Sequence, residues 1–232
     1  MNPPPVPPSY PPLPLPPRPK SSNAVAIVVV IAVCIFVGIA VIAVLAAIAI
    51  PSFARARQRA QATMAMSNAR QLHQAVYRMV LDNSVAPNPD LGWPGDLAVS
   101  TVRPVVSLGQ YVDRLVEYKY LERESLPQLF KAPGIPPYPG TGVFDSEYSP
   151  FKMYRVKETD LDTCLFLATR NFAYGSGLDP AVQPFGSQVG VIVRKGGDAQ
   201  ALTSEKAQST EVGRLPGKEN RGVETAESVL KM

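Results

Sequence analysis

Residues 24–50 read AVAIVVVIAVCIFVGIAVIAVLAAIAI, and this stretch decides the fold. It holds 27 residues without a charged or strongly polar side chain. At about 1.5 Å per residue, a helix of this length exceeds the roughly 30 Å hydrocarbon core of a bilayer. We therefore predict a transmembrane helix over residues 24–50. A secretory signal peptide is the alternative, but the apolar part of such a signal typically has only about 7–15 residues.

The residues before the apolar stretch form a proline-rich segment over 1–23. Of the 25 prolines in the chain, 11 lie within the first 20 residues. Proline lacks the amide donor that helices and sheets need, and it favours extended polyproline II. We predict a disordered tail or a semi-rigid spacer. Its PxxP spacings follow from the composition alone and do not by themselves indicate a docking motif.

After Pro51 the pattern changes, and apolar side chains recur at the spacing of one helical face. This pattern predicts that the helix continues in amphipathic form over residues 51–83. The transmembrane and amphipathic parts would then form one long stem helix. The residues on the predicted apolar face are Ala65, Ala69, Leu72, Val76, Met79 and Val80.

Residues 84–207 read as a small α+β domain. Ser107 is a candidate N-cap for a short helix, and Ser125 is a candidate cap for another short turn of helix. An acidic turn separates two strand-like runs and predicts a β-hairpin, which a third run follows. The predicted strands cover 152–157, 163–169 and 189–194.

The fold class that we predict is α+β, with a long N-terminal transmembrane and amphipathic stem helix and a small antiparallel β-sheet domain packed on it. We expect Trp93 to fold over the stem as a buried aromatic residue. Polar residues dominate 208–232, and we predict a C-terminal tail that frays.

The basic charge of the chain is uneven. The formal net charge is +4, yet residues 51–83 alone hold five arginines against one aspartate. The larger remainder, 84–232, is slightly acidic. Basic residues beside an apolar helix favour contact with anionic lipid head groups. The charge distribution therefore indicates a membrane-lipid partner and no nucleic-acid partner.

The sequence offers little catalytic chemistry. His73 is the only histidine, so multi-histidine metal sites and most histidine-dependent triads lack their parts. We expect His73 to be an ordinary surface residue of the stem. We predict no enzyme activity, no cofactor and no metal site, although a calcium site near turn aspartates remains an open alternative. Those aspartates are Asp160, Asp162 and Asp198.

Residues 44–57 read VLAAIAIPSFARAR, and this segment resembles the amino-terminal helix of type IV pilins and type II secretion pseudopilins. The close resemblance covers about Val41–Asn83. It implies a pilin-like fold, in which an apolar helix continues as an amphipathic helix under a small antiparallel sheet. It also implies a structural role in a bacterial pilus or secretion system.

The chain departs from that family at the processing site. Members carry a Gly-Phe-Thr-Leu-Ile-Glu-like motif that a prepilin peptidase cuts after the glycine. The corresponding positions hold Val29 and Val30 at the cleavage pair and Cys34 in place of the glutamate. We therefore predict that the amino terminus is retained.

The resemblance implies a single-pass protein of the bacterial inner membrane with a periplasmic C-terminal domain, and we expect Cys164 to lie outside the cytoplasm. The arginines after Pro51 favour the opposite orientation by the positive-inside tendency. The expected function is helix–helix assembly, with itself, with other pilin-like subunits or with secretion-machinery components as partners. A membrane-tethered ligand-binding or sensory domain is the alternative. The predicted helix-packing residues are Ala40, Ala43, Ala46, Ala47, Pro51 and Phe53.

Overall fold

The computed structural model describes residues 22–208, 212–217 and 229–230, and the chain divides into two compact units, Met1–Ser52 and Phe53–Met232. Helix α1 (Ser22–Val85) contributes residues to both units. The predicted proline-rich tail lies almost wholly outside the described residues.

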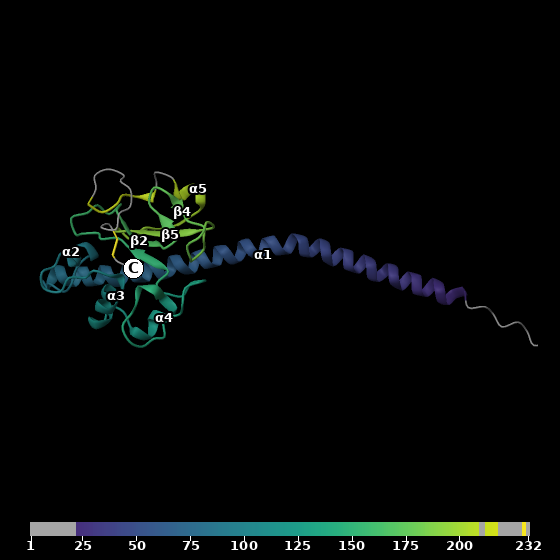
Figure 1. Cartoon of the computed structure of the whole chain (residues 1–232), viewed down its shortest axis with the longest axis horizontal. Helices are drawn as coiled ribbons and strands as arrows, with labels where there is room; N and C mark the ends of the chain where they lie inside the picture. Colours follow the sequence, from purple (N-terminus) through teal and green to yellow (C-terminus); the bar gives the residue numbers. More distant parts are fainter. Residues whose placement is uncertain (1–21, 209–211, 218–228, 231–232) are drawn as a thin grey trace, which may run out of the picture. The chain divides into compact units, whose positions relative to one another are not determined.

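Figure 1 labels many of the helices and strands that follow α1. The helices are α2 (Pro94–Ala98), α3 (Leu108–Glu117), α4 (Leu126–Leu129) and α5 (Ser204–Ala207), with 3-10 turns at Arg123–Ser125 and Ser146–Tyr148. The strands are β1 (Phe151–Met153), β2 (Leu165–Thr169), β3 (Phe172–Ala173), β4 (Gly177–Leu178), β5 (Gly190–Arg194) and β6 (Ala199–Leu202).

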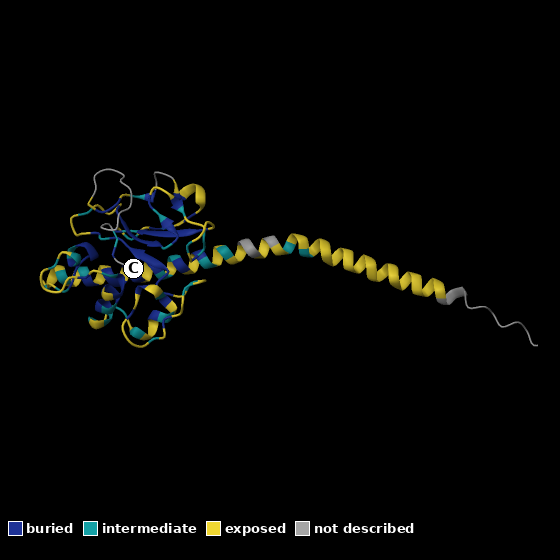
Figure 2. Ribbon diagram, viewed as in Figure 1, coloured by how far each residue is buried: buried dark blue, intermediate teal, exposed yellow. Residues whose placement is uncertain are grey.

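In the N-terminal unit the apolar part of α1 has no protein packed around it. Val25–Ile50 is the one helical segment among the described residues that is long and apolar enough to cross a membrane. Its large side chains are exposed, as Phe36 shows with 73% of its surface accessible (Figure 2). The helix continues through Pro51, and the Ser52 hydroxyl donates to the Ile48 carbonyl at 3.0 Å. The chain thus has the apolar helix that the sequence predicts.

In the C-terminal unit α1 is amphipathic, as the residue spacing predicts. Five of the six apolar residues named above are buried and the sixth, Val80, is half-buried. The facing elements in the same core include α3, α4, β2 and β5. The i, i+3, i+4, i+7 spacing places these side chains in one stripe, so burying that stripe leaves the polar residues of α1 at the surface.

The main sheet is antiparallel, with strand order β1-β2-β5-β6. The predicted hairpin is confirmed, since Phe151 pairs with Thr169 and Met153 with Leu167, but its first strand ends at Met153 and does not reach residue 157. The sequence pattern predicted neither β6 nor the separate β3–β4 pair. These strands are short, and β6 reads Ala-Gln-Ala-Leu, which lacks the β-branched and aromatic residues that favour strands.

The two faces of the sheet are buried in different cores. Phe166 and Leu167 belong to the core that contains α1, whereas Leu165 and Ala168 belong to a second core. Adjacent strand residues normally point to opposite faces. The pairing of β2 with β5 is irregular between Leu165 and Leu167, and such a bulge adds one residue to the strand. Two consecutive side chains can therefore pack in the same core.

Parts of the predicted C-terminal tail pack into both cores, Leu215 into the second and Leu230 into the one that contains α1. Leu215 is fully buried, and Arg214 forms a bridge with Cys164. Leu230 is also buried, and its amide donates to the Met153 carbonyl at 2.9 Å. The expectation of fraying is therefore wrong for residues 212–217 and 229–230. The apolar residues of this segment are few and stand among polar ones, and they are buried because the folded sheet provides a core for them.

The two predicted helix caps behave differently. The Ser107 hydroxyl accepts from the Gln110 amide at 3.2 Å, so the N-cap of α3 is confirmed. Ser125 precedes α4, but its hydroxyl donates to the Glu122 carbonyl at 2.7 Å and makes no cap bond. Ser125 already has αR geometry at the end of a 3-10 turn, whereas a capping residue is typically extended.

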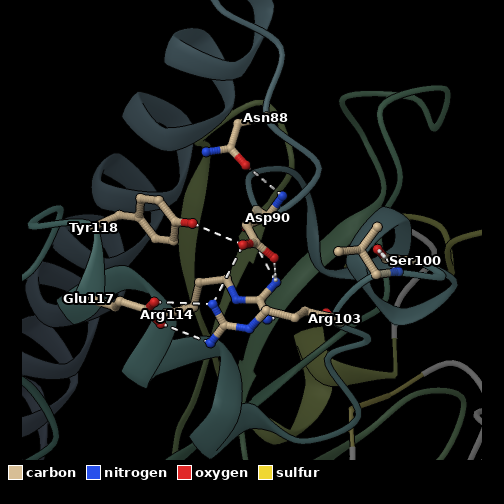
Figure 3. A network of polar contacts seen from close by, with 8 residues as sticks. Asn88, Asp90, Ser100, Arg103, Arg114, Glu117 and Tyr118 are labelled. Carbon is tan, nitrogen blue, oxygen red and sulfur yellow. Dashed lines mark hydrogen bonds and ion pairs between the residues drawn. The ribbon is translucent and has the colours of Figure 1, made fainter.

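A polar network fixes the connection that follows α1 (Figure 3). Asp90 accepts a hydrogen bond from Tyr118 at 3.0 Å and lies 3.3 Å from the buried Arg114 guanidinium. Arg114 also donates to the Arg103 carbonyl at 3.1 Å, and Arg103 pairs with Glu117 at 3.0 Å. The network joins Asp90 and Arg103, which lie on either side of α2 in the chain, to α3 and Tyr118, so these irregular segments are held by charge-assisted hydrogen bonds.

Candidate functional site

The C-terminal unit contains a groove beside α1, and His73 forms part of its floor. His73 is 7% exposed, and its Nε2 lies 2.7 Å from the Lys195 carbonyl oxygen. Because a carbonyl only accepts, Nε2 carries the proton and donates. Burial lowers the pKa of His73, a shift that the hydrogen bond to Lys195 partly opposes, which favours the neutral imidazole. The prediction of an ordinary surface histidine is wrong.

The β5–β6 turn can approach His73 because it contains glycine. Gly197 has φ +87°, and a Cβ at this position would lie 3.1 Å from His73 Cε1. Both the left-handed backbone and the short separation favour glycine. A single residue type at the turn therefore permits the contact between β5–β6 and α1.

Trp93 and Lys195 lie against the histidine. The Trp93 ring centroid is 6.1 Å from that of His73, and both rings make edge-to-face contacts with Phe166. Trp93 is 2% exposed, so the expectation of an aromatic residue buried against the stem is confirmed. Its Nε1 donates to Glu158 Oε2 at 2.7 Å, which fixes the Glu158 carboxylate at the edge of the groove.

The Lys195 ammonium is occupied by the protein itself. Its Nζ donates to the carbonyls of Glu158 at 2.6 Å and Asp160 at 2.7 Å, and it lies 5.4 Å from the centre of the Trp93 ring. A buried ammonium is stable only with such partners. Lys195 thus holds the 158–160 loop to the β5–β6 turn and has little capacity left for a ligand.

The groove above this floor has a volume of about 750 Å³. This is within the range of about 300–1,000 Å³ that is typical of ligand sites. It is open, and its two sides differ in charge. The lining residues are Arg70, His73, Gln74, Tyr77, Arg78, Val80, Leu81 and Ser84 of α1, with Trp93, Glu158, Asp162, Lys195, Gly196 and Gly197.

The turn aspartates do not converge on a metal position. Asp160 accepts from the Lys157 amide at 2.7 Å and from the Gly217 amide at 3.1 Å, whereas Asp198 pairs with Arg194. Within residues 22–208, 212–217 and 229–230, no group of three or more His, Cys, Asp or Glu side chains could hold a metal ion. The Asp160 and Asp198 carboxylates instead stabilise turns.

The predicted helix-packing residues are not among those that line the groove. Ala40, Ala43 and Ala47 are exposed on the apolar helix, and their i, i+3, i+7 spacing places them along one face. Ala46 is half-exposed. Phe53 is 75% exposed in the C-terminal unit, and Pro51 continues the helix.

The surface of the apolar helix is hollowed beside Ala40. The hollow has a volume of about 330 Å³ and lies between larger side chains. It is almost entirely apolar in character because every residue around it is apolar. The lining residues are Phe36, Val37, Ala40, Val41, Val44 and Leu45.

The groove itself was not found from the sequence. His73 and Lys195 are 122 positions apart, so no local motif joins them. One sequence signal pointed to a buried His73: it is next to Leu72 and three residues before Val76, both of which lie on the apolar face of α1. A core-facing stripe commonly includes the position next to its central row. That geometry would have placed His73 at the edge of the buried face.

Comparison with protein-family models, curated proteins and solved structures finds no match for this chain. The molecule therefore defines only a broad class: a chain with one N-terminal helix capable of crossing a membrane and a C-terminal α+β unit with a small antiparallel sheet.

Proposed function

We propose that this chain is a pilin-like, or pseudopilin-like, structural or accessory protein of a type II secretion or type IV pilus-type system. In this proposal Val25–Ile50 anchors it in the bacterial inner membrane and the C-terminal unit is periplasmic. The observation that carries the proposal is the apolar helix Val25–Ile50. In its most apolar stretch no residue is buried within the structure. In water such a surface would be unfavourable, whereas lipid or a neighbouring helix can cover it.

The alanine face of this helix supports assembly by helix packing. Within a bilayer, helices gain little from removing apolar surface from lipid, so their association depends on close approach of small side chains. Ala40, Ala43 and Ala47 supply such a face, and the hollow beside Ala40 offers space for a side chain of a second helix. The partner is a second copy or another pilin-like subunit.

Cross-linking in the native membrane tests this assembly. The double change Ala43→Leu and Ala47→Leu should abolish cross-links within the bilayer while the protein still inserts and its C-terminal unit still folds. Ala49→Leu is the matched control, because residue 49 lies about 200° around the helix from residue 47. Equal cross-linking of wild type and the double variant would mean that the alanines face lipid only.

Orientation and processing are tested separately. Protease added to intact spheroplasts should remove the C-terminal unit, and full protection until lysis would reverse the proposed topology. Mass spectrometry of the purified membrane form should find the proline-rich peptide attached, because Val29 and Val30 stand at the expected cleavage pair. A chain that begins near Val30 would contradict retention.

A second candidate function is a membrane-tethered ligand-binding domain, and the groove beside His73 favours it. The groove combines a buried, hydrogen-bonded floor with exposed charges, and its volume is in the range of ligand sites. The two functions are distinguishable, since changes in the groove would leave cross-linking through the alanine face intact.

A further inference from the structure

The length of the groove limits the ligands that would fill it. Along α1 the lining residues extend from Arg70 to Ser84. At about 1.5 Å per residue this distance is about 21 Å. An extended polypeptide rises about 3.3 Å per residue, so about six residues would cover the groove. A single amino acid or a simple ion would leave most of it empty.

The exposed charges on the two sides of the groove are opposite, whereas Lys195 is buried. Arg70 and Arg78 line the side formed by α1, and Glu158 and Asp162 line the other side. Arg70 donates to the Ala199 carbonyl at 3.3 Å. In the part of the chain that the structure describes, Arg78 and the Asp162 carboxylate have no hydrogen bond or ion pair. Both charged groups are therefore available to a ligand.

The middle of the groove suits a backbone lying flat. Tyr77 is 48% exposed and stacks near His73, with their ring centroids 6.1 Å apart. Gln74, one turn from Arg70 and from Arg78, is exposed and presents both a donor and an acceptor. Gly196 and Gly197 contribute no side chains to the opposite side.

We infer that this groove binds an extended segment of another polypeptide in which acidic and basic side chains alternate. Successive side chains of an extended chain point to opposite sides. The acidic side chains would thus face Arg70 and Arg78, and the basic ones would face Glu158 and Asp162. A purely anionic ligand would meet the two carboxylates, and a purely cationic one would meet the two arginines. The inference goes beyond helix assembly and does not depend on it.

The experiment uses the full-length protein in lipid nanodiscs and a fluorescein-labelled hexapeptide, Ac-Glu-Lys-Glu-Lys-Glu-Lys-NH₂. Fluorescence anisotropy should show saturable binding, weaker at high salt because exposed charge pairs are screened. Hexaglutamate and hexalysine with the same label should bind at least about twofold more weakly, since each meets one repulsive side. Absence of saturable binding by the alternating peptide, or equal binding by either single-sign peptide, overturns the inference.

Two variants locate the binding. Arg78→Gln and Asp162→Asn should each weaken binding by about two- to fivefold, the range that exposed charge pairs give. Both side chains are exposed, so the fold should persist, as unchanged tryptophan fluorescence would show. Glu205→Gln and Lys206→Gln, on α5 and outside the groove, are matched controls and should bind as wild type. Unchanged binding by both groove variants places the peptide elsewhere and overturns the inference.

Discussion

Replacing His73 with glutamine removes the only imidazole of the chain but keeps an N–H that can donate to the Lys195 carbonyl. Burial lowers the pKa of His73, so the folded protein binds this proton less tightly than the unfolded chain does. The stability that neutral His73 confers is therefore present above the unfolded pKa of about 6.5. It is lost progressively as the pH falls below that value toward the lower folded pKa.

The size of the effect is bounded by one proton. Linkage limits the loss in the free energy of unfolding to about 1.4 kcal/mol for each pH unit between the two pKa values. With a urea m-value of about 1–3 kcal/mol/M, a 1 kcal/mol loss lowers the unfolding midpoint by about 0.3–1 M. His73→Gln should lack this His73-dependent loss between neutral and mildly acidic pH.

The assay is urea unfolding of the full chain in detergent at about pH 7.5 and about pH 5.5, on either side of the ordinary histidine pKa. Trp93 is the only tryptophan and is 2% exposed, so its fluorescence reports the loss of this core. Burial raises the pKa of Asp96, and this carboxyl titrates alike in both proteins. If wild type and His73→Gln lost stability equally between the two pH values, the assignment to His73 would be refuted.

Three further changes test the packing and the caps, each measured by urea unfolding with tryptophan fluorescence. Leu72→Ala, at a fully buried position of α1, should lower the free energy of unfolding by about 2–5 kcal/mol. Met64, which is 59% exposed, is the control, and Met64→Ala should change the free energy of unfolding by less than about 0.5 kcal/mol. Similar losses in the two variants would contradict the assignment of the buried face. Ser107→Ala should lower the free energy of unfolding by about 1 kcal/mol because it removes the N-cap hydrogen bond. Ser125→Ala should have a smaller effect, since the Ser125 hydroxyl makes no cap bond. A larger loss for Ser125→Ala than for Ser107→Ala would contradict these two hydrogen-bond patterns. Arg114→Ala should lower the free energy of unfolding by about 1.5–3 kcal/mol, because it removes the hydrogen bonds from the guanidinium to the Asp90 and Arg103 carbonyls, while Asp90 keeps Arg103 as a counter-ion at 3.5 Å. A near-neutral result would mean that the network of Figure 3 does not stabilise the loop.

The features that the sequence predicted correctly depend on residues close together in the chain. The apolar helix Val25–Ile50 follows from an unbroken run of apolar residues. The buried stripe of α1 follows from helical periodicity, and the Ser107 cap from its position before α3. Each of these structures is favoured by local backbone hydrogen bonding and side-chain spacing, which are visible in a short window.

The features that were missed depend on distant contacts. The irregular pairing between Leu165 and Leu167 is a property of β2 and β5 together, so it changes which side chains reach each core without any local mark. The burial of Leu215 and Leu230 requires the completed sheet. The local secondary-structure propensity of the sequence around these leucines does not predict their burial. The apolar surface that the folded sheet offers determines where they lie.

The sequence by itself determined that one segment is too apolar for water and that the next segment is an amphipathic helix, because both properties are sums over neighbouring residues. Only the tertiary structure decided the groove. It is formed by α1, by Trp93, by residues 158–162 and by the turn at 195–197, and it depends on a hydrogen bond between residues 122 positions apart. Burial then changed the chemistry of the parts: it lowered the pKa of His73, and contacts with two carbonyls and Trp93 engaged the Lys195 ammonium. The charges that remain exposed on either side were available in the sequence, but their opposition across one groove follows from packing alone.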